Sequence, residues 1–178
     1  TNGQRWETSG QVESSFKWHG DWAWRIHADC ENGGDRSTAK YLLNNTGSRE
    51  KSLNLTLGHR CRVWCIEAGY SLFSQKLGVM LSAQMGNEEL LQERIRLGQP
   101  IDFSPFSRHI GYPHQKVSHQ TAFVKVSFKP EGIGQFAWQT TFQQDDRREN
   151  RIRRMNHSDI PTVSLHLRSL QNAQTWSR

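Results

Sequence analysis

Residues 16–29 constrain the fold more than any other stretch, because apolar and polar side chains alternate along them. In the run FKWHGDWAWRIHAD, every second residue from 22 to 28 is apolar, and mainly charged residues fill the positions between. Successive side chains of a β-strand point to opposite faces, so this period of two predicts a strand with one apolar and one polar face. The pair His19 and Gly20 predicts a bend at its start.

Further segments of the chain also read as strands. Turn signals rich in Gly, Asn and Pro separate many of them at intervals of about 8–12 residues, which favours an antiparallel arrangement. A parallel sheet would need crossover helices that the sequence does not supply. The predicted strands are Thr38 to Asn44, Ser52 to Leu57, Cys61 to Ser74 (with a bulge at Gly69), Leu77 to Ala83, Thr121 to Lys129, Gln135 to Gln143 and Pro161 to Arg168.

One helix is predicted, over residues 87–97. Asn87 is a suitable N-cap, Glu88 suits the positive end of the helix dipole, and Gly98 with Pro100 terminates the pattern. The sequence therefore predicts an all-β fold, an antiparallel β-sandwich of about seven to nine strands with one short helix. The tryptophan rings are expected to pack between its two sheets.

Length and composition predict one domain over residues 1–178, cut from a longer protein, with residues 1–10 and 171–178 frayed. No stretch approaches the roughly 18 apolar residues of a membrane helix, so no membrane partner is expected. Cys61 and Cys65 lie about 13 Å apart in an extended strand, which is too far for a disulfide. Three unpaired cysteines favour an intracellular, reducing location, cytoplasmic or nuclear.

The chain lacks the common catalytic motifs. It contains no nucleophile elbow, Gly-rich phosphate loop or H-E-x-x-H pair, which favours a non-enzymatic protein without a cofactor. The combination of His59, Cys61 and Cys65 holds zinc-type ligands, but their spacing along a strand favours buried thiols over a metal site. No metal site is therefore predicted.

A basic segment, RRENRIRR, follows the predicted strand at Gln135 to Gln143. Guanidinium groups bind phosphates and carboxylates through paired hydrogen bonds, and the net charge of +6 favours acidic partners. Binding of nucleic acid or another polyanion through this segment is the alternative functional hypothesis, against a solvated loop. Its arginines are Arg147, Arg148, Arg151, Arg153 and Arg154.

From Asp21 to Phe128 the chain resembles a MATH (TRAF-like) domain. The stretches WAWRIHADCENGG and KYLLNN are similar to a strand, a glycine-bearing turn and a tyrosine-leucine strand of that family, and CRVWCIEAGYSLF is similar to its central strand. Ile110-Gly111 replaces the tryptophan-glycine pair usual before the family's final loop. The start KWHG also resembles the C-terminal region of germ cell-less type BTB adaptors.

Both resemblances imply a module that binds a peptide or protein segment, often as the substrate receptor of a ubiquitin-ligase adaptor. By position in the family pattern, Tyr41, Tyr70 and Tyr112 would line a shallow peptide groove. Tyrosine is enriched at binding hot spots, although Tyr41 and Tyr70 fit equally well as core rings. Protein recognition, with an unknown oligomeric state, is therefore the first functional hypothesis.

Overall fold

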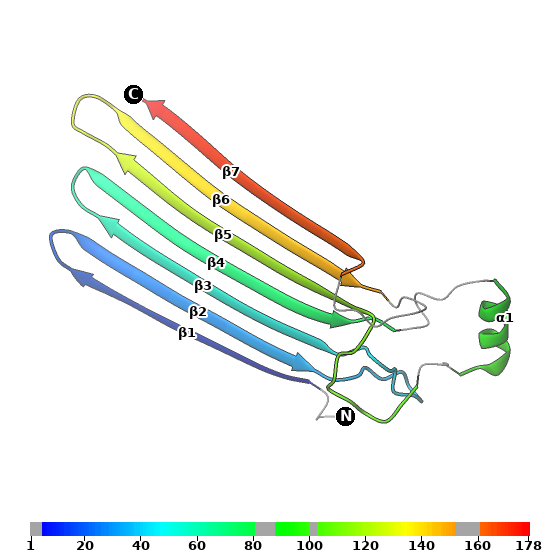
Figure 1. The fold of residues 1–178 in the computed structure, drawn as a ribbon. Helices are drawn as coiled ribbons and strands as arrows, with labels where there is room; N and C mark the ends of the chain where they lie inside the picture. Colours follow the sequence, from blue (N-terminus) through cyan, green and yellow to red (C-terminus); the bar gives the residue numbers. More distant parts are fainter. Residues whose placement is uncertain (1–4, 81–87, 100–102, 152–160) are drawn as a thin grey trace.

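The strands of the protein form one antiparallel sheet, which a computed structural model describes for residues 5–80, 88–99, 103–151 and 161–178 (Figure 1). Neighbours in the sequence are neighbours in the sheet, in the order β1-β2-β3-β4-β5-β6-β7. The helix α1 lies outside the sheet (Figure 1). The elements are β1 (Arg5–Lys17), β2 (Asp21–Gly33), β3 (Ser48–Arg60), β4 (Trp64–Gly78), α1 (Glu88–Leu97), β5 (His114–Phe128), β6 (Gln135–Asn150) and β7 (Val163–Ser177).

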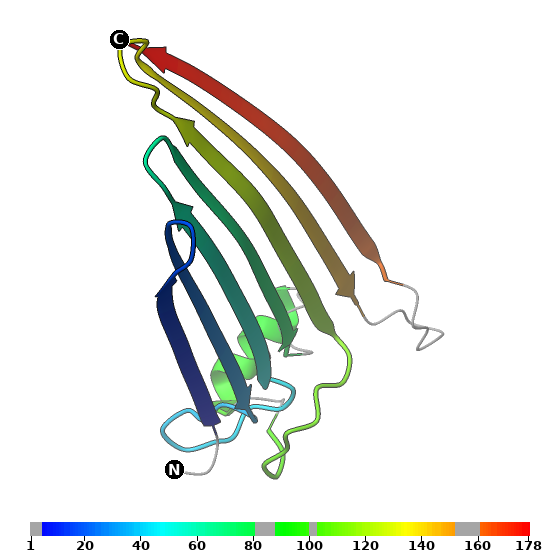
Figure 2. The ribbon, with the colours of Figure 1, turned by 90° about the vertical axis from the view of Figure 1, so that its left-hand side faces the viewer.

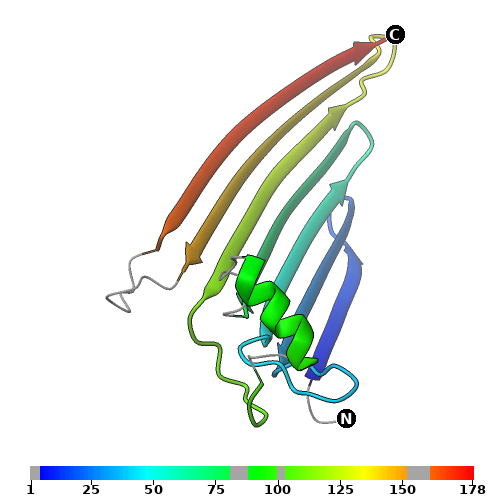
Figure 3. The same ribbon diagram turned by 90° about the vertical axis from the view of Figure 1, so that its right-hand side faces the viewer.

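The two ends of the sheet differ in their connections. At one end, here called the hairpin end, residues 18–20, 61–63 and 129–134 make short links between consecutive strands. At the opposite end, the loop end, longer segments connect the strands, and α1 lies there (Figures 1 and 3). The sheet is curved along its strands (Figure 2).

Local chemistry explains the tight hairpins and the unbroken strands. His19 and Gly20 have φ angles of 48° and 135°, and the positive φ at Gly20 is accessible because glycine lacks a Cβ atom. Every pair of strands keeps one register along its whole length, so the sheet contains no bulge. The bulge predicted at Gly69 is wrong. A Cβ atom there would lie 2.4 Å from the ring of Phe123, so this glycine makes room for an aromatic ring of the neighbouring strand.

The prediction of an antiparallel all-β fold with seven to nine strands and one short helix is confirmed. The strands nevertheless form one layer, whereas a sandwich would need two facing sheets. The tryptophans do not pack between sheets: Trp64 is 42% exposed and Trp176 is 62% exposed. Alternation along a strand shows that one face is apolar, but it does not show which surface covers that face.

Several boundaries differ from the predictions. Residues 38–44 make only isolated bridges, Ser37 with Leu42 and Leu43 with Phe103, because hydrogen bonds within the loop replace strand pairing. Leu77 and Gly78 belong to β4, which pairs with β5, so the predicted hairpin partner of β4 is wrong; its residues 81–83 lie outside the described residues. Residues 5–10 and 171–177, expected to fray, are paired in β1 and β7. The helix is confirmed over Glu88–Leu97, and Gly98 ends it with a φ of 62°, whereas the predicted N-cap Asn87 lies outside the described residues.

Two buried polar side chains organise the loop end. The carboxylate of Asp35 accepts hydrogen bonds from the backbone N–H groups of Thr46 and Ser107, each at 3.1 Å. The amide of Asn45 donates to the carbonyl oxygens of Val79 and Pro113 at 2.8 and 2.7 Å. Its Oδ1 atom accepts from the N–H of Gly111 at 2.8 Å. These bonds tie the long connections to one another.

Buried apolar side chains are scarce. Among the described residues, only Ile110 is a buried hydrophobic residue, at 3% exposure, and it lies in a loop rather than in the sheet. A sheet of this size normally buries at least one face against another layer. The apolar side chains of the strands therefore remain available to an external partner.

Candidate functional site

The register assigns every strand residue to one of two faces of the sheet. Directly paired residues lie on the same face, and residues alternate between faces along each strand. All tryptophans of the strands share one face, which we call the apolar face; the other is the polar face. These tryptophans are Trp6, Trp22, Trp24, Trp64, Trp138 and Trp176.

Aliphatic side chains fill the middle of the apolar face. Ile26, Leu55, Leu57, Ile66 and Val124 lie there and are each between 36% and 46% exposed. All of them except Ile66 line a shallow hollow of about 640 Å³ in the middle of the sheet. We call this zone the apolar band. Exposed apolar area of such continuity marks a surface that contacts a protein or a membrane.

Beside the apolar band, the apolar face is more polar on the two outer strands, although each adds one exposed apolar side chain there: Val12 of β1 beside Ile26, and Leu170 of β7 beside Phe142. In β1, Ser14 occupies the position next to Trp24. In β7, Asn172 and Gln174 lie on the apolar face, and Asn172 accepts a hydrogen bond from the hydroxyl of Thr140 at 2.5 Å. The apolar band is therefore most continuous over β2–β6.

An aromatic belt lies on the apolar face at the hairpin end. Trp64 and Phe128, paired across β4 and β5, have ring centroids 4.3 Å apart. Trp22 stacks on His59 of β3 at 4.2 Å. Cross-strand aromatic pairs stabilise a sheet. The aromatic belt consists of Phe16, Trp22, Trp64, Phe128, Phe136, Trp138 and Trp176.

A row of cations crosses the apolar face at the loop end. Arg49 pairs with Lys76, Lys76 with Lys116, and Lys116 with Arg148, so four adjacent strands each contribute one cation. We call these four residues the cation row. The ammonium of Lys76 donates to the carbonyl of Ile110 at 3.0 Å. Its pKa lies below the ordinary value because the group is desolvated and because Lys116 and Arg49 repel its charge.

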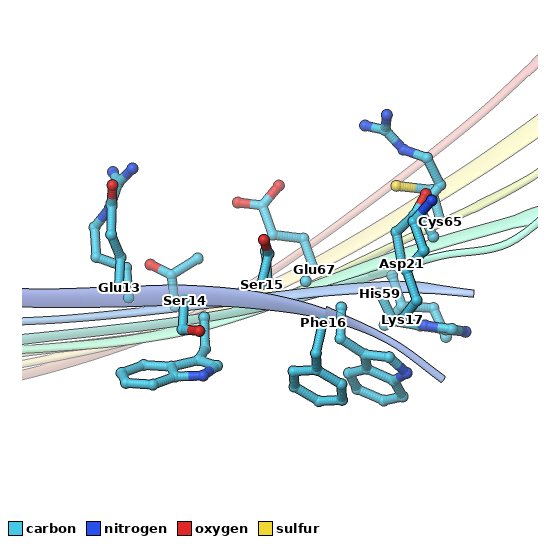
Figure 4. Close-up of a pocket in the computed structure, with 17 residues that line it drawn as sticks. Glu13, Ser14, Ser15, Phe16, Lys17, Asp21, His59, Cys65 and Glu67 are labelled. Carbon is cyan, nitrogen blue, oxygen red and sulfur yellow. The ribbon is translucent and has the colours of Figure 1, made fainter. Parts of the chain in front are cut away.

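The polar face carries charges of both signs, several of which pair with one another, and in β7 it also carries the exposed side chains of Val163, Leu165 and Leu167. Every Asp and Glu of the strands except Asp146 lies on this face. Arg25 binds Glu13 at 2.8 Å across β1 and β2. Figure 4 shows the division near the hairpin end, where Glu13 and Glu67 project from one side of the sheet and Phe16 from the other. The hollow in this region has a volume of about 990 Å³.

The three tyrosines do not form one groove. Tyr41 contacts Phe103 in the connections at the loop end, with ring centroids 5.9 Å apart, and Tyr112 precedes β5 at the same end. Tyr70 lies in the apolar band, where its hydroxyl bonds Gln120 at 3.1 Å. It is eight residues, or about 27 Å, from the last residue of β4, Gly78. Tyr70 is therefore separated from the other two.

The described arginines of the basic segment do not share one surface. Arg147 lies on the polar face and the next residue, Arg148, on the apolar face. Arg147 and Arg151 both bind Glu149, at 2.7 and 3.3 Å, and these contacts lower the pKa of that carboxyl group. The predicted site residues Arg153 and Arg154 lie outside the described residues.

The described residues contain no group of three His, Cys, Asp or Glu side chains that could hold a metal ion. Cys30, Cys61 and Cys65 are free thiols. In the part of the chain that the structure describes, no helix has the length and hydropathy needed to cross a membrane.

No protein-family model, curated protein or solved structure matches the chain. The site must therefore be interpreted from its own geometry. Sequence reasoning missed the cation row, whose members are far apart in the sequence and come together only through the strand register. The available signal was a cation two to five residues beyond one end of each of four predicted strands.

Proposed function

We propose that the protein contacts a lipid bilayer through its apolar face, with the inner strands running across the hydrocarbon. The observation that carries this proposal is the order of residue types along the strands. The aromatic belt, the apolar band and the cation row follow one another from the hairpin end to the loop end. Aromatic rings and cationic side chains are enriched at the two borders of membrane hydrocarbon, with aliphatic side chains between them.

The length of the apolar face suits a bilayer. In β4, apolar side chains occupy every second position from Trp64 to Leu72. Eight residues of strand span about 27 Å, close to the roughly 30 Å of a hydrocarbon core. Lys76 lies four residues farther along, about 14 Å beyond Leu72, at a distance that suits the headgroup region.

The edges of the sheet set a condition for this arrangement. The outer backbone groups of β1 and β7 have no strand partner within the described residues. Unsatisfied N–H and C=O groups cost several kcal/mol each in hydrocarbon. Other strands must therefore pair with β1 and β7 where the sheet lies within the bilayer. This proposal departs from the sequence-based expectation that the protein has no membrane partner, which considered only membrane helices.

Fluorescence quenching tests the contact with lipid. The purified protein is mixed with phosphatidylcholine vesicles whose acyl chains carry bromine. Tryptophan emission is expected to fall by at least half, because the tryptophans of the strands all lie on the apolar face. Vesicles with unbrominated chains are the control, and acrylamide quenching should decrease in both. Equal emission with both types of vesicle, and unchanged acrylamide quenching, would show that the face does not contact lipid.

A second candidate function is the binding of an extended peptide segment, which follows the hypothesis of protein recognition. The observation that favours it is the pair of open edges: all 13 residues of β1 are exposed, and its outer backbone groups are available for strand addition. The resemblance to MATH domains implies the same class of partner. Polyanion binding through Arg147–Arg154 has weaker support, since Glu149 binds two of these arginines.

Hydrogen exchange tests strand addition. A synthetic peptide with the sequence of β2, which already pairs with β1 along its inner side, is expected to slow amide exchange in β1 by tenfold or more. The central strand β4 provides the internal control, because both of its sides are paired. Equal exchange in β1 with and without the peptide would contradict this candidate.

A further inference from the structure

We propose that the cation row binds the phosphate of an anionic lipid headgroup at the border of the bilayer. This inference rests on the proposed contact between the apolar face and lipid. The four cations, Arg49, Lys76, Lys116 and Arg148, occupy directly paired positions in four adjacent strands. At roughly 4.8 Å between strands, the row is about 14 Å long, comparable to one or two headgroups.

The four cations of the row are only partly balanced by a neighbouring acid, since Arg148 acts electrostatically on the carboxylate of Asp146. Like charges directly opposite in a sheet are destabilising, and no carboxylate occupies the row. The only strand carboxylate on the apolar face, Asp146, binds His166 of β7. Glu50 and Glu149 lie at the same end of the sheet but on the polar face. An external anion would therefore relieve the repulsion that remains among the four cations.

Two cations of the row are fixed by hydrogen bonds to loop carbonyls, and the other two are not. Arg49 donates to the carbonyl of Arg108 at 3.1 Å, and Lys76 donates to that of Ile110 at 3.0 Å. Lys116 and Arg148 are exposed and make no hydrogen bond or ion pair within the described part of the chain. The pKa of Lys76 is lowered first by desolvation and then by the charges of Lys116 and Arg49, and a phosphate bound at the row would oppose this shift.

The position of the row favours a phosphate carried by a lipid. Acyl chains that cover the apolar band direct the attached phosphate toward the loop end, where the row lies about 14 Å beyond Leu72. Arginine supplies paired hydrogen bonds to phosphate, and lysine adds a point charge. A free phosphate would bind through the same contacts but would gain nothing from the adjacent apolar band. The two sources are therefore separable by experiment.

The test compares vesicles of phosphatidylcholine alone with vesicles that also contain phosphatidic acid. The wild-type protein is expected to bind the anionic vesicles at least tenfold more tightly, and this preference should fall as salt is raised. The double variant Lys116→Gln/Arg148→Gln should lose the preference by roughly tenfold to thirtyfold, at about fivefold for each cation. Its binding to phosphatidylcholine should be unchanged.

A matched control lies on the same two strands. Lys125→Gln/Arg147→Gln removes one lysine from β5 and one arginine from β6, but on the polar face, and should keep the preference. An equal loss in both double variants would overturn the inference, since net charge alone would then explain it. If the first variant fails to fold by circular dichroism, the single variants Lys116→Gln and Arg148→Gln replace it, and each should lose the preference by about fivefold.

The remaining outcomes separate this inference from the proposed function. Equal wild-type binding to both types of vesicle would overturn the role of the cation row and leave the contact with lipid intact. Binding to neither type would overturn both. Inorganic phosphate provides the third arm: if it abolishes the preference at concentrations of a few millimolar, the row is a site for free phosphate and the lipid source is rejected.

Discussion

Replacing Leu55 by lysine is expected to weaken binding to phosphatidylcholine vesicles by about 30-fold or more. Leu55 lies at the centre of the apolar band, paired with Ile26 on one side and Tyr70 on the other. A lysine near the midplane of a bilayer costs about 2–4 kcal/mol on a lipid-facing strand, and about 1.4 kcal/mol corresponds to a factor of ten. Flotation of vesicles over a range of lipid concentrations measures the change.

The control for this variant is the adjacent residue. Asn54→Lys introduces the same side chain in the same strand, but on the exposed polar face, where Asn54 pairs with His27 and Ser71. Its binding should remain within a factor of three of the wild-type value. Similar losses in both variants would indicate a general effect of charge or folding, and would contradict a specific contact through the apolar face.

Replacing Asn45 by alanine is expected to lower the free energy of unfolding by about 3 kcal/mol. The buried side chain of Asn45 makes three hydrogen bonds to the backbone of two other segments, at Val79 and at residues 111–113. A buried polar group that loses its partner costs about 1–3 kcal/mol. Some of the backbone groups released by the substitution will find new partners, including water, so the total loss should stay at about 3 kcal/mol. Urea unfolding followed by circular dichroism measures the change.

A glycine variant separates the two roles of Asn45. Its φ angle is 55°, in the left-handed region, where an alanine costs about 1–2 kcal/mol and a glycine almost nothing. Asn45→Gly should therefore lose the hydrogen bonds but retain the backbone conformation, and should be about 1 kcal/mol more stable than Asn45→Ala. The exposed Asn54→Ala should change stability by less than about 0.5 kcal/mol. A small effect of both substitutions at position 45 would show that its hydrogen bonds do not hold the loop end.

Asn45 also connects the fold to the proposed site. Gly111, whose N–H bonds Asn45, follows Ile110, whose carbonyl accepts the hydrogen bond of Lys76. The same segment supplies the carbonyl of Arg108 that binds Arg49. Loss of Asn45 would therefore release two members of the cation row as well as weaken the loop end. The stability of the loops and the geometry of the row are linked through residues 108–111.

Local features of the fold were accessible from the sequence wherever neighbouring residues determine them. The alternation at residues 22–28 predicts β2, and the positive φ angles at His19 and Gly20 agree with the predicted bend. The helix follows from its acidic first turn and from Gly98. Strand lengths were underestimated, as in β7, because polar residues near the ends of strands obscure the alternation.

The sequence by itself determined that the chain is a series of antiparallel strands with an apolar and a polar side, because side-chain direction depends only on the period along each strand. The tertiary structure alone decided that these strands form one layer, that the tryptophan rings share an exposed face, and that Arg49, Lys76, Lys116 and Arg148 form a row. These properties depend on the register between strands. The register is set by pairing between residues far apart in the chain, which no single segment specifies.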